Sequence, residues 1–586
     1  MKQFQKIGVA AAVASVAAGA VAQQVSRTET GDLAIVPYYS VKDGVNTGLH
    51  IINTTESTQV VKVRLRRGTD SKDALDFNVV MSPRDEWTAN IGAGGDTGVQ
   101  VTTNDTSCTV PAFTDGVAQM PSTFSEGADE GYVEIIAMAE AESETSHIAI
   151  GAKHVNGVPT SCDIVRQNFY RVPLGSVDIM SVRGTHTSSS VSSGACTSAD
   201  NIVLPGTTTT AAVTALGYCT DGVPQNESVM IDSDDNALKV SFMLTDSDGG
   251  LEAGDNAVMV EGFADAPMMT NQQPLSFGTD GILKFDPLNF ELPNLGFGSY
   301  TSSDPTRQED ATASITNGSM MIGLMDALDA DSIINDWAAF DTADGTVNAD
   351  WVVTLPGQYV MVNPVCEAYA AYTASAANAV SACATATNAA WIGATANDRN
   401  QLPLEIATTN DELSLVEGSN LSLWDREEEQ ILGEDTPEKP VDPELGFSPG
   451  GDEGVPPGTP ITVELPYEVN VIDFGAEGAP SALVSDLKLT VTPYEGYDRG
   501  WGRLDIEPDD GNGQGIASWQ LTGAADDGDI TADYGATGFD DALPLNDDHV
   551  AVVGFAVWQR SFAAQAGNYG RIVEHSTITS NGRTPD

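Results

Sequence analysis

The stretch Val60-Val61-Lys62-Val63-Arg64-Leu65-Arg66 decides the fold class, because aliphatic and basic residues alternate along it from Val61 onward. A period of two indicates a β-strand with one apolar face and one polar face. We therefore expect a half-buried strand, with its aliphatic side chains in a core and its basic side chains on the opposite face.

The same pattern extends outward from this strand. Residues 75–81 alternate in the same way, and Ser82-Pro83-Arg84-Asp85 turns the chain into a further strand over residues 86–91. Other strands are predicted over residues 132–136, 147–150, 238–244, 257–260, 350–355, 462–465, 468–471 and 550–558. Short strands without intervening helices favour antiparallel sheets. The predicted fold class is mainly β: one or more antiparallel β-sandwiches of the Ig-like or jelly-roll type, with loop and small helical insertions.

Composition suggests a division of the chain into domains. We expect an N-terminal β-sandwich over residues 23–185, a Ser/Thr-rich insertion over 186–222 and a second β-rich domain over 223–586. Within the second domain, residues 320–340 and the Ala-rich insertion 365–400 favour helix, and residues 425–460 form an acidic loop rich in Pro and Gly. An alternative is one discontinuous sandwich that combines the second domain with residues 23–185.

The charge and the first residues indicate where the protein resides. A basic start is followed by an apolar run that ends in Ala20-Val21-Ala22, which predicts a signal peptide over residues 1–22, cut before Gln23. The chain carries 84 acidic and 26 basic residues, a net charge of −58, which disfavours nucleic acid as a partner. No later apolar run is long enough to span a bilayer. We expect a secreted protein, extracellular or on the outer cell surface.

Six cysteines follow the signal, and an even number in an exported chain suggests disulfide bonds. Fifteen connectivities are possible, of which we favour pairing between neighbours in sequence. The predicted disulfides are Cys108–Cys162, Cys196–Cys219 and Cys366–Cys383.

Acidic residues cluster in Gly-containing loops that could supply several oxygen ligands to calcium. The candidate calcium ligands are Asp232, Asp234, Asp246, Asp248, Glu252, Asp255, Asp509, Asp510, Asp527 and Asp529. None of these loops completes an EF-hand, and Asp and Gly also favour ordinary turns. Calcium is therefore a candidate cofactor, and solvated turns are the alternative.

The basic residues Lys62, Arg64, Arg66 and Arg67 are concentrated in six positions of an otherwise acidic chain. They could form a surface anchor for lipopolysaccharide phosphates, or for an acidic face of a second copy. The alternative, which we favour, is cross-strand pairing with Asp76 and Asp85.

Catalytic motifs are missing from the sequence, which has no nucleophile elbow, no His-Glu-x-x-His and no phosphate-binding loop. With 84 carboxylates, pairs suited to glycoside hydrolysis carry almost no information. We therefore predict a protein that is not an enzyme. Tryptophans could form sugar-stacking platforms, although their apolar and glycine neighbours favour packing in the core. These tryptophans are Trp351, Trp424, Trp501, Trp519 and Trp558.

Several strings resemble those of uncharacterised secreted proteobacterial cell-surface proteins. They are residues 53–55, 75–78, 82–87, 350–354 and 424–428. The size, acidity and Thr/Ala/Val/Asp-rich β character also resemble surface-layer and biofilm-matrix proteins of marine gammaproteobacteria, and neither resemblance implies a site residue.

These observations lead to a non-enzymatic structural protein of the bacterial surface, which assembles with itself as an oligomer or lattice bridged by divalent cations. The alternatives are an extracellular adhesin or carbohydrate-binding protein, with surface glycans as partners, and a secreted hydrolase.

Overall fold

The computed structural model describes most of residues 23–167, 230–268, 319–357, 419–431, 461–506 and 550–578, together with short hairpins between them. The predicted signal peptide, the Ala-rich insertion 365–400 and most of the acidic loop 425–460 lie outside the described residues. The described chain is mainly β, and its sheets are antiparallel apart from one short parallel pair. The fold class is confirmed at this level.

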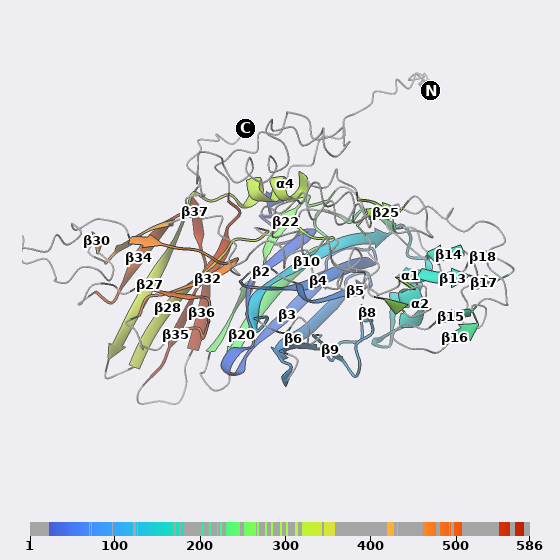
Figure 1. The fold of residues 1–586 in the computed structure, drawn as a ribbon, viewed down its shortest axis with the longest axis horizontal. Helices are drawn as coiled ribbons and strands as arrows, with labels where there is room; N and C mark the ends of the chain where they lie inside the picture. The colour runs from blue at the N-terminus through green and yellow to red at the C-terminus, as the bar shows by residue number, and fades with distance from the viewer. Residues whose placement is uncertain are drawn as a thin grey trace, which may run out of the picture.

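Two sheets form the central body, drawn from blue to green in Figure 1. The first contains, in order, β1 (Gln24–Val25), β22 (Val258–Glu261), β2 (Leu33–Ser40), β10 (Glu130–Ala141), β4 (Gln59–Arg67), β5 (Asp73–Met81) and β8 (Cys108–Val110), with β19 (Met230–Ile231) beside β10. The second contains β21 (Leu251–Asn256), β20 (Leu238–Asp246), β3 (Val45–Asn53), β6 (Glu86–Ala93), β7 (Val99–Thr102) and β9 (Val117–Gln119). Their inner faces share one core, in which Phe77 of β5 contacts Trp87 of β6 with ring centroids 5.7 Å apart.

A second sandwich lies beside the first pair of sheets, in yellow-green to red in Figure 1. Its eleven described strands form one hydrogen-bonded network, in which β27 runs from one sheet of the sandwich into the other. One sheet contains β30 (Gln430–Ile431), β29 (Ser419–Trp424), β34 (Arg499–Asp505) and the first part of β27 (Ser332–Thr342), with β31 (Ile461–Val463) and β37 (Ser576–Ile578) at its margins. The other contains the end of β27, β28 (Gly345–Thr354), β32 (Val469–Asp473), β33 (Lys488–Thr490), β35 (Val553–Arg560) and β36 (Tyr569–Glu574). Trp351 packs between these sheets against Phe474, with ring centroids 5.2 Å apart.

Helices are few and short in the described chain: η1 (Lys42–Gly44), α1 (His147–Ala152), α2 (Cys162–Gln167) and α4 (Ser319–Leu328). Two-stranded hairpins complete the described elements: β11 (His154–Val155) with β12 (Val158–Pro159), β13 (Arg171–Leu174) with β14 (Val177–Met180), β15 (Asn201–Val203) with β16 (Thr210–Ala212), β17 (Cys219–Thr220) with β18 (Val223–Pro224), β23 (Ser276–Phe277) with β24 (Leu283–Lys284), and β25 (Tyr300–Ser302) with β26 (Ala311–Ala313). The predicted loop-like insertion 186–222 therefore contains one strand pair, β15 with β16, and the first strand of another, β17.

Three local predictions need correction. The boundary at residue 223 is wrong, because β20 pairs with β3, and β22 pairs with β2, inside the first sandwich. Residues 147–150 form helix α1 rather than a strand, since the Ser146 side chain accepts a hydrogen bond from the backbone N–H of Ala149 and caps the helix. The predicted helix over 320–340 ends at Leu328, and the β-branched and aromatic residues that follow form β27.

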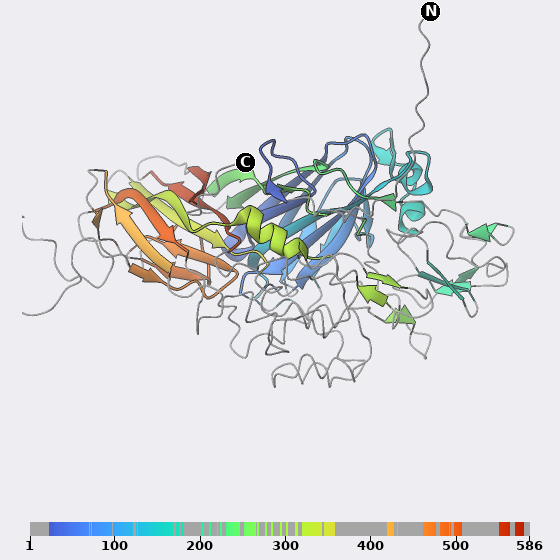
Figure 2. The ribbon, with the colours of Figure 1, turned by 90° about the horizontal axis from the view of Figure 1, so that it is seen from above.

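Direct contacts join the two sandwiches, which lie side by side in Figures 1 and 2. The backbone N–H of Val469 donates to the Gly68 carbonyl at 2.9 Å, and the Thr354 hydroxyl donates to the Pro37 carbonyl at 2.7 Å. The Tyr132 hydroxyl donates to Glu468 Oε1 at 3.3 Å, and burial raises the pKa of Glu468 to about 8. The described sandwiches therefore share buried polar contacts in addition to apolar ones.

Candidate functional site

A groove of about 420 Å³ opens on the second sandwich and is lined by both of its sheets. One wall comes from β27, β34 and the two residues that follow β29, and the other comes from β28, β35 and β36. The lining residues are Asp336, Trp337, Val347, Asp425, Arg426, Arg499, Gly500, Trp501, Trp558, Gln559, Arg560, Tyr569 and Arg571. We call this feature the arginine–tryptophan groove.

The first wall is an aromatic platform. Trp501 on β34 stands opposite Trp424 on β29, and their rings stack with centroids 4.1 Å apart and planes 8° from parallel. Trp501 keeps 37% of its surface exposed. Gly500 makes this close pairing possible, because a Cβ at that position would lie 1.7 Å from the Trp424 carbonyl oxygen. The local sequence thus brings the two strands together and presents a flat indole face to the groove.

The second wall combines aromatic rings with guanidinium groups. Arg571 on β36 is in register with Trp558 on β35, and its Cζ lies 4.6 Å from the centroid of the Trp558 ring. Arg560 pairs in register with Tyr569, whose side chain is 51% exposed. A guanidinium over an aromatic face is held by cation–π attraction, which leaves its N–H donors available to a ligand.

The groove has an excess of positive charge in a strongly negative protein. Four of the chain's 26 basic residues line it, against the carboxylates of Asp336 and Asp425. Arg499 lies 3.6 Å from Asp498, whereas the ion pairs among the described residues do not include Arg426, Arg560 or Arg571. The guanidinium groups of these three residues therefore keep N–H donors for a ligand. These donors, together with flat apolar rings, suit a ligand that has both ring faces and acceptor oxygens.

The sequence identifies two of the groove's tryptophans as possible sugar-stacking residues but does not connect them with its arginines. Trp351 is buried, as core packing predicts, and Trp519 lies outside the described residues. Trp501 and Trp558 line the groove, and Trp424 supports Trp501 from behind. The local signal is Arg499-Gly500-Trp501, in which a basic and an aromatic residue share one face of a strand.

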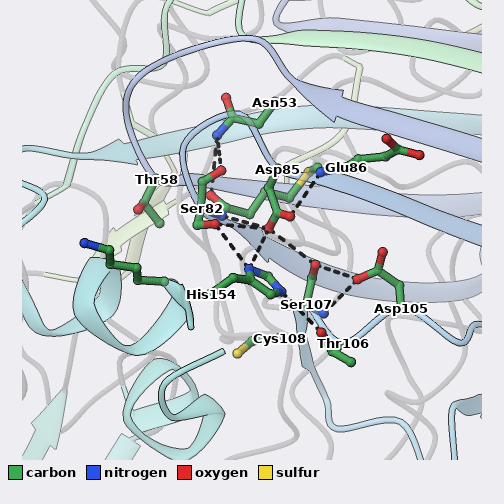
Figure 3. A network of polar contacts seen from close by, with 12 residues as sticks. Asn53, Thr58, Ser82, Asp85, Glu86, Asp105, Thr106, Ser107, Cys108 and His154 are labelled. Atoms are coloured by element: carbon green, nitrogen blue, oxygen red, sulfur yellow. Dashed lines mark hydrogen bonds and ion pairs between the residues drawn. The ribbon is translucent and has the colours of Figure 1, made fainter. Parts of the chain in front are cut away.

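A second polar cluster, at the edge of the first sandwich, brings together Ser82, Asp85, Ser107 and His154 (Figure 3). His154 Nδ1 lies 3.3 Å from Ser82 Oγ and 3.5 Å from Asp85 Oδ2, so serine and aspartate share one ring nitrogen. A catalytic relay needs them on opposite nitrogens. Burial raises the pKa of Asp85, and the nearby His154 opposes that change. This cluster ties the segment after α1 to the sandwich.

The disulfide Cys108–Cys162 joins β8 to α2 near this cluster, as predicted. The cysteines at 196, 366 and 383 lie outside the described residues, so Cys196–Cys219 and Cys366–Cys383 stay predictions.

The predicted surface anchor is wrong for its central members. Lys62, Arg64 and Arg66 are at most 1% exposed. Arg64 Nε lies 2.9 Å from Asp76 Oδ1, and Arg66 Nε lies 3.0 Å from Glu134 Oε1. The carboxylates stand on β5 and β10, on either side of β4, and neutralise the stripe so that it can be covered. Arg67, at the strand end, remains partly exposed.

The cross-strand alternative is confirmed for Asp76, although the pairs are buried rather than exposed. Asp85 belongs instead to the His154 cluster described above. The strand is therefore buried on both faces. Alternation in the sequence indicates which side chains are polar, but it does not indicate whether they are exposed.

The predicted calcium ligands do not meet within the described chain. Asp246 ends β20, whereas Asp232 and Asp234 precede its start at Leu238, about 25 Å away along an extended strand. Asp246 pairs with Leu251 at one end of the hairpin that β20 and β21 form, close to Glu252. Asp255 pairs with Phe242, nearer the other end of that hairpin. No group of three acidic, histidine or cysteine side chains suited to a metal occurs among the described residues. Asp248, Asp509, Asp510, Asp527 and Asp529 lie outside them.

Comparison of the chain with protein-family models, curated proteins and solved structures found no match. Within the described chain, no helix is both long and apolar enough to cross a membrane.

Proposed function

We propose that this protein is a secreted, non-enzymatic component of a bacterial surface coat or matrix that binds a carbohydrate chain in the arginine–tryptophan groove. The export signal and acidity predicted from the sequence supply the setting. The observation that carries the proposal is the groove itself, where the exposed faces of Trp501 and Tyr569 accompany guanidinium donors on both walls.

The chemistry of a sugar matches these walls. One face of a pyranose ring carries C–H groups, which pack on an aromatic plane, while its rim carries oxygens that accept hydrogen bonds. The Trp424–Trp501 stack holds the indole plane rigid. A rigid platform loses little conformational entropy on binding, which favours affinity.

The test is binding of the mature protein to a panel of neutral and acidic polysaccharides, followed by titration calorimetry and tryptophan fluorescence. Trp501→Ala should weaken binding at least tenfold, because it removes the exposed stacking surface. Met243→Ala, which changes an exposed residue on β20 of the first sandwich, is the matched control. Absence of binding to every polysaccharide would refute the proposal, as would unchanged affinity of the Trp501→Ala variant.

A further inference from the structure

We infer that the groove selects acidic polysaccharides, with ring carboxylates as the recognised groups; this inference rests on the proposed carbohydrate-binding function. It names a ligand class that neither the composition nor the fold indicates, since a chain of net charge −58 repels polyanions at long range.

The arginines of the groove provide the groups that would recognise a carboxylate. A guanidinium presents parallel N–H donors that match the two oxygens of a carboxylate. Arg560 and Arg571 come from adjacent strands of one wall, and Arg426 and Arg499 come from the facing wall. A carboxylated sugar ring can therefore lie on an aromatic face while its acid group meets a guanidinium.

Aromatic rings, rather than carboxylates, support two of the groove's arginines. Many basic side chains elsewhere in the described chain lie against carboxylates, as Arg64 does with Asp76 and Arg503 does with Asp505 at 2.6 Å. Arg560 and Arg571 instead lie over the Phe562 and Trp558 rings, at 4.7 and 4.6 Å from their centroids. Aromatic support holds these cations without neutralising them, which leaves their charge for an anionic ligand.

The inference predicts an unusual dependence on salt. Attraction within the groove acts over a few ångströms, whereas repulsion by the whole protein acts over the Debye length, about 10 Å at 0.1 M and about 3 Å at 1 M ionic strength. Added salt first screens the repulsion and then weakens the groove contacts. Affinity for an acidic polysaccharide should therefore rise and then fall as sodium chloride increases, whereas affinity for a neutral one should change little.

The experiment compares polygalacturonate, alginate and hyaluronan with their methyl-esterified forms, which keep the rings and lose the charge. Wild-type protein should bind at least one acid form at least tenfold more tightly than its ester. The Arg560→Gln/Arg571→Gln double variant should lose that preference. Arg503→Gln, on the same strand as Trp501 but outside the groove, and Arg84→Gln, an exposed arginine of the first sandwich, should keep it.

The outcomes separate the two claims. Equal affinity for acids and esters would overturn acid selection and leave carbohydrate binding intact, whereas absence of binding to any polysaccharide would overturn both. A third result would be that the wild-type protein associates with itself in the absence of glycan, that the Arg560→Gln/Arg571→Gln variant does not, and that acidic glycans fail to inhibit the association. It would place an acidic segment of a second copy in the groove and would overturn the inference.

Discussion

The buried carboxyl of Glu468 gives a prediction whose size follows from the structure. Its Oε1 accepts hydrogen bonds from the Gly357 backbone N–H at 2.7 Å and from the Tyr132 hydroxyl at 3.3 Å, at the junction of the two sandwiches. Glu468→Gln keeps an oxygen in that position and removes the titration. We therefore expect the variant to fold with the same junction.

The sign follows from where the proton is held. Burial raises the pKa of Glu468 from 4.5 in the unfolded chain to about 8 in the folded protein. Between these values the folded state keeps a proton that the unfolded state has released, so the free energy of unfolding falls as pH rises, by about 1.4 kcal/mol per unit. From pH 5 to pH 8 the loss from this group is about 4 kcal/mol.

The assay is urea unfolding of the wild type and of Glu468→Gln at pH 5, 6, 7 and 8. The difference in unfolding free energy should shift in favour of the variant by about 4 kcal/mol over this range. The contributions of groups remote from residue 468 are common to both proteins and cancel in the difference. Glu142→Gln, at an exposed position, is the control for replacing a glutamate elsewhere on the same protein. A constant difference for Glu468→Gln, or a shift of the opposite sign, would refute the reasoning.

Three further substitutions test the fold and the groove. Arg66→Ala leaves the Glu134 charge buried and should lower the unfolding free energy by about 3–5 kcal/mol. The control, Arg84→Ala, removes an exposed contact with Glu56 and should lower it by about 1 kcal/mol or less. Equal losses for the two variants in urea unfolding would contradict the buried pairing. Replacing Cys108 and Cys162 by serine opens a loop that spans a sequence separation of 54. It should lower the unfolding free energy by about 4 kcal/mol in the chain-entropy estimate, and a negligible loss would count against the bond. Gly500→Ala places a Cβ where the Trp424 carbonyl lies and should weaken polysaccharide binding at least tenfold, measured by tryptophan fluorescence; unchanged affinity would show that the Trp424–Trp501 stack is dispensable.

The sequence was sufficient to identify the strands with strong alternation. β4, β5 and β20 lie where the period of two predicts them, and the apolar run at 550–558 leads into β35, which pairs with β28 and β36. Local patterns failed where a neighbour decides the outcome. The basic stripe on β4 could not be recognised as buried, because its carboxylates come from β5 and from the distant β10.

The groove could not be predicted for the same physical reason. Its walls join residues near 336, 425, 500 and 560, which the pairing of β34 with β27 and β29, and of β28 with β27 and β35, brings together. Each tryptophan, taken alone in the sequence, resembles a core residue. The return of β20–β22 to the first sandwich was hidden in a similar way, since sequence order gives no information about which strands pair across an insertion.

The most direct test of the central claim is a crystal structure of the protein with an acidic oligosaccharide that it binds in solution. We predict that one sugar ring packs on Trp501 or Tyr569 and that its carboxylate lies within hydrogen-bond distance of Arg560 or Arg571. An oligosaccharide bound elsewhere on the molecule, or bound in the groove with its carboxylates directed away from every arginine, would contradict the account.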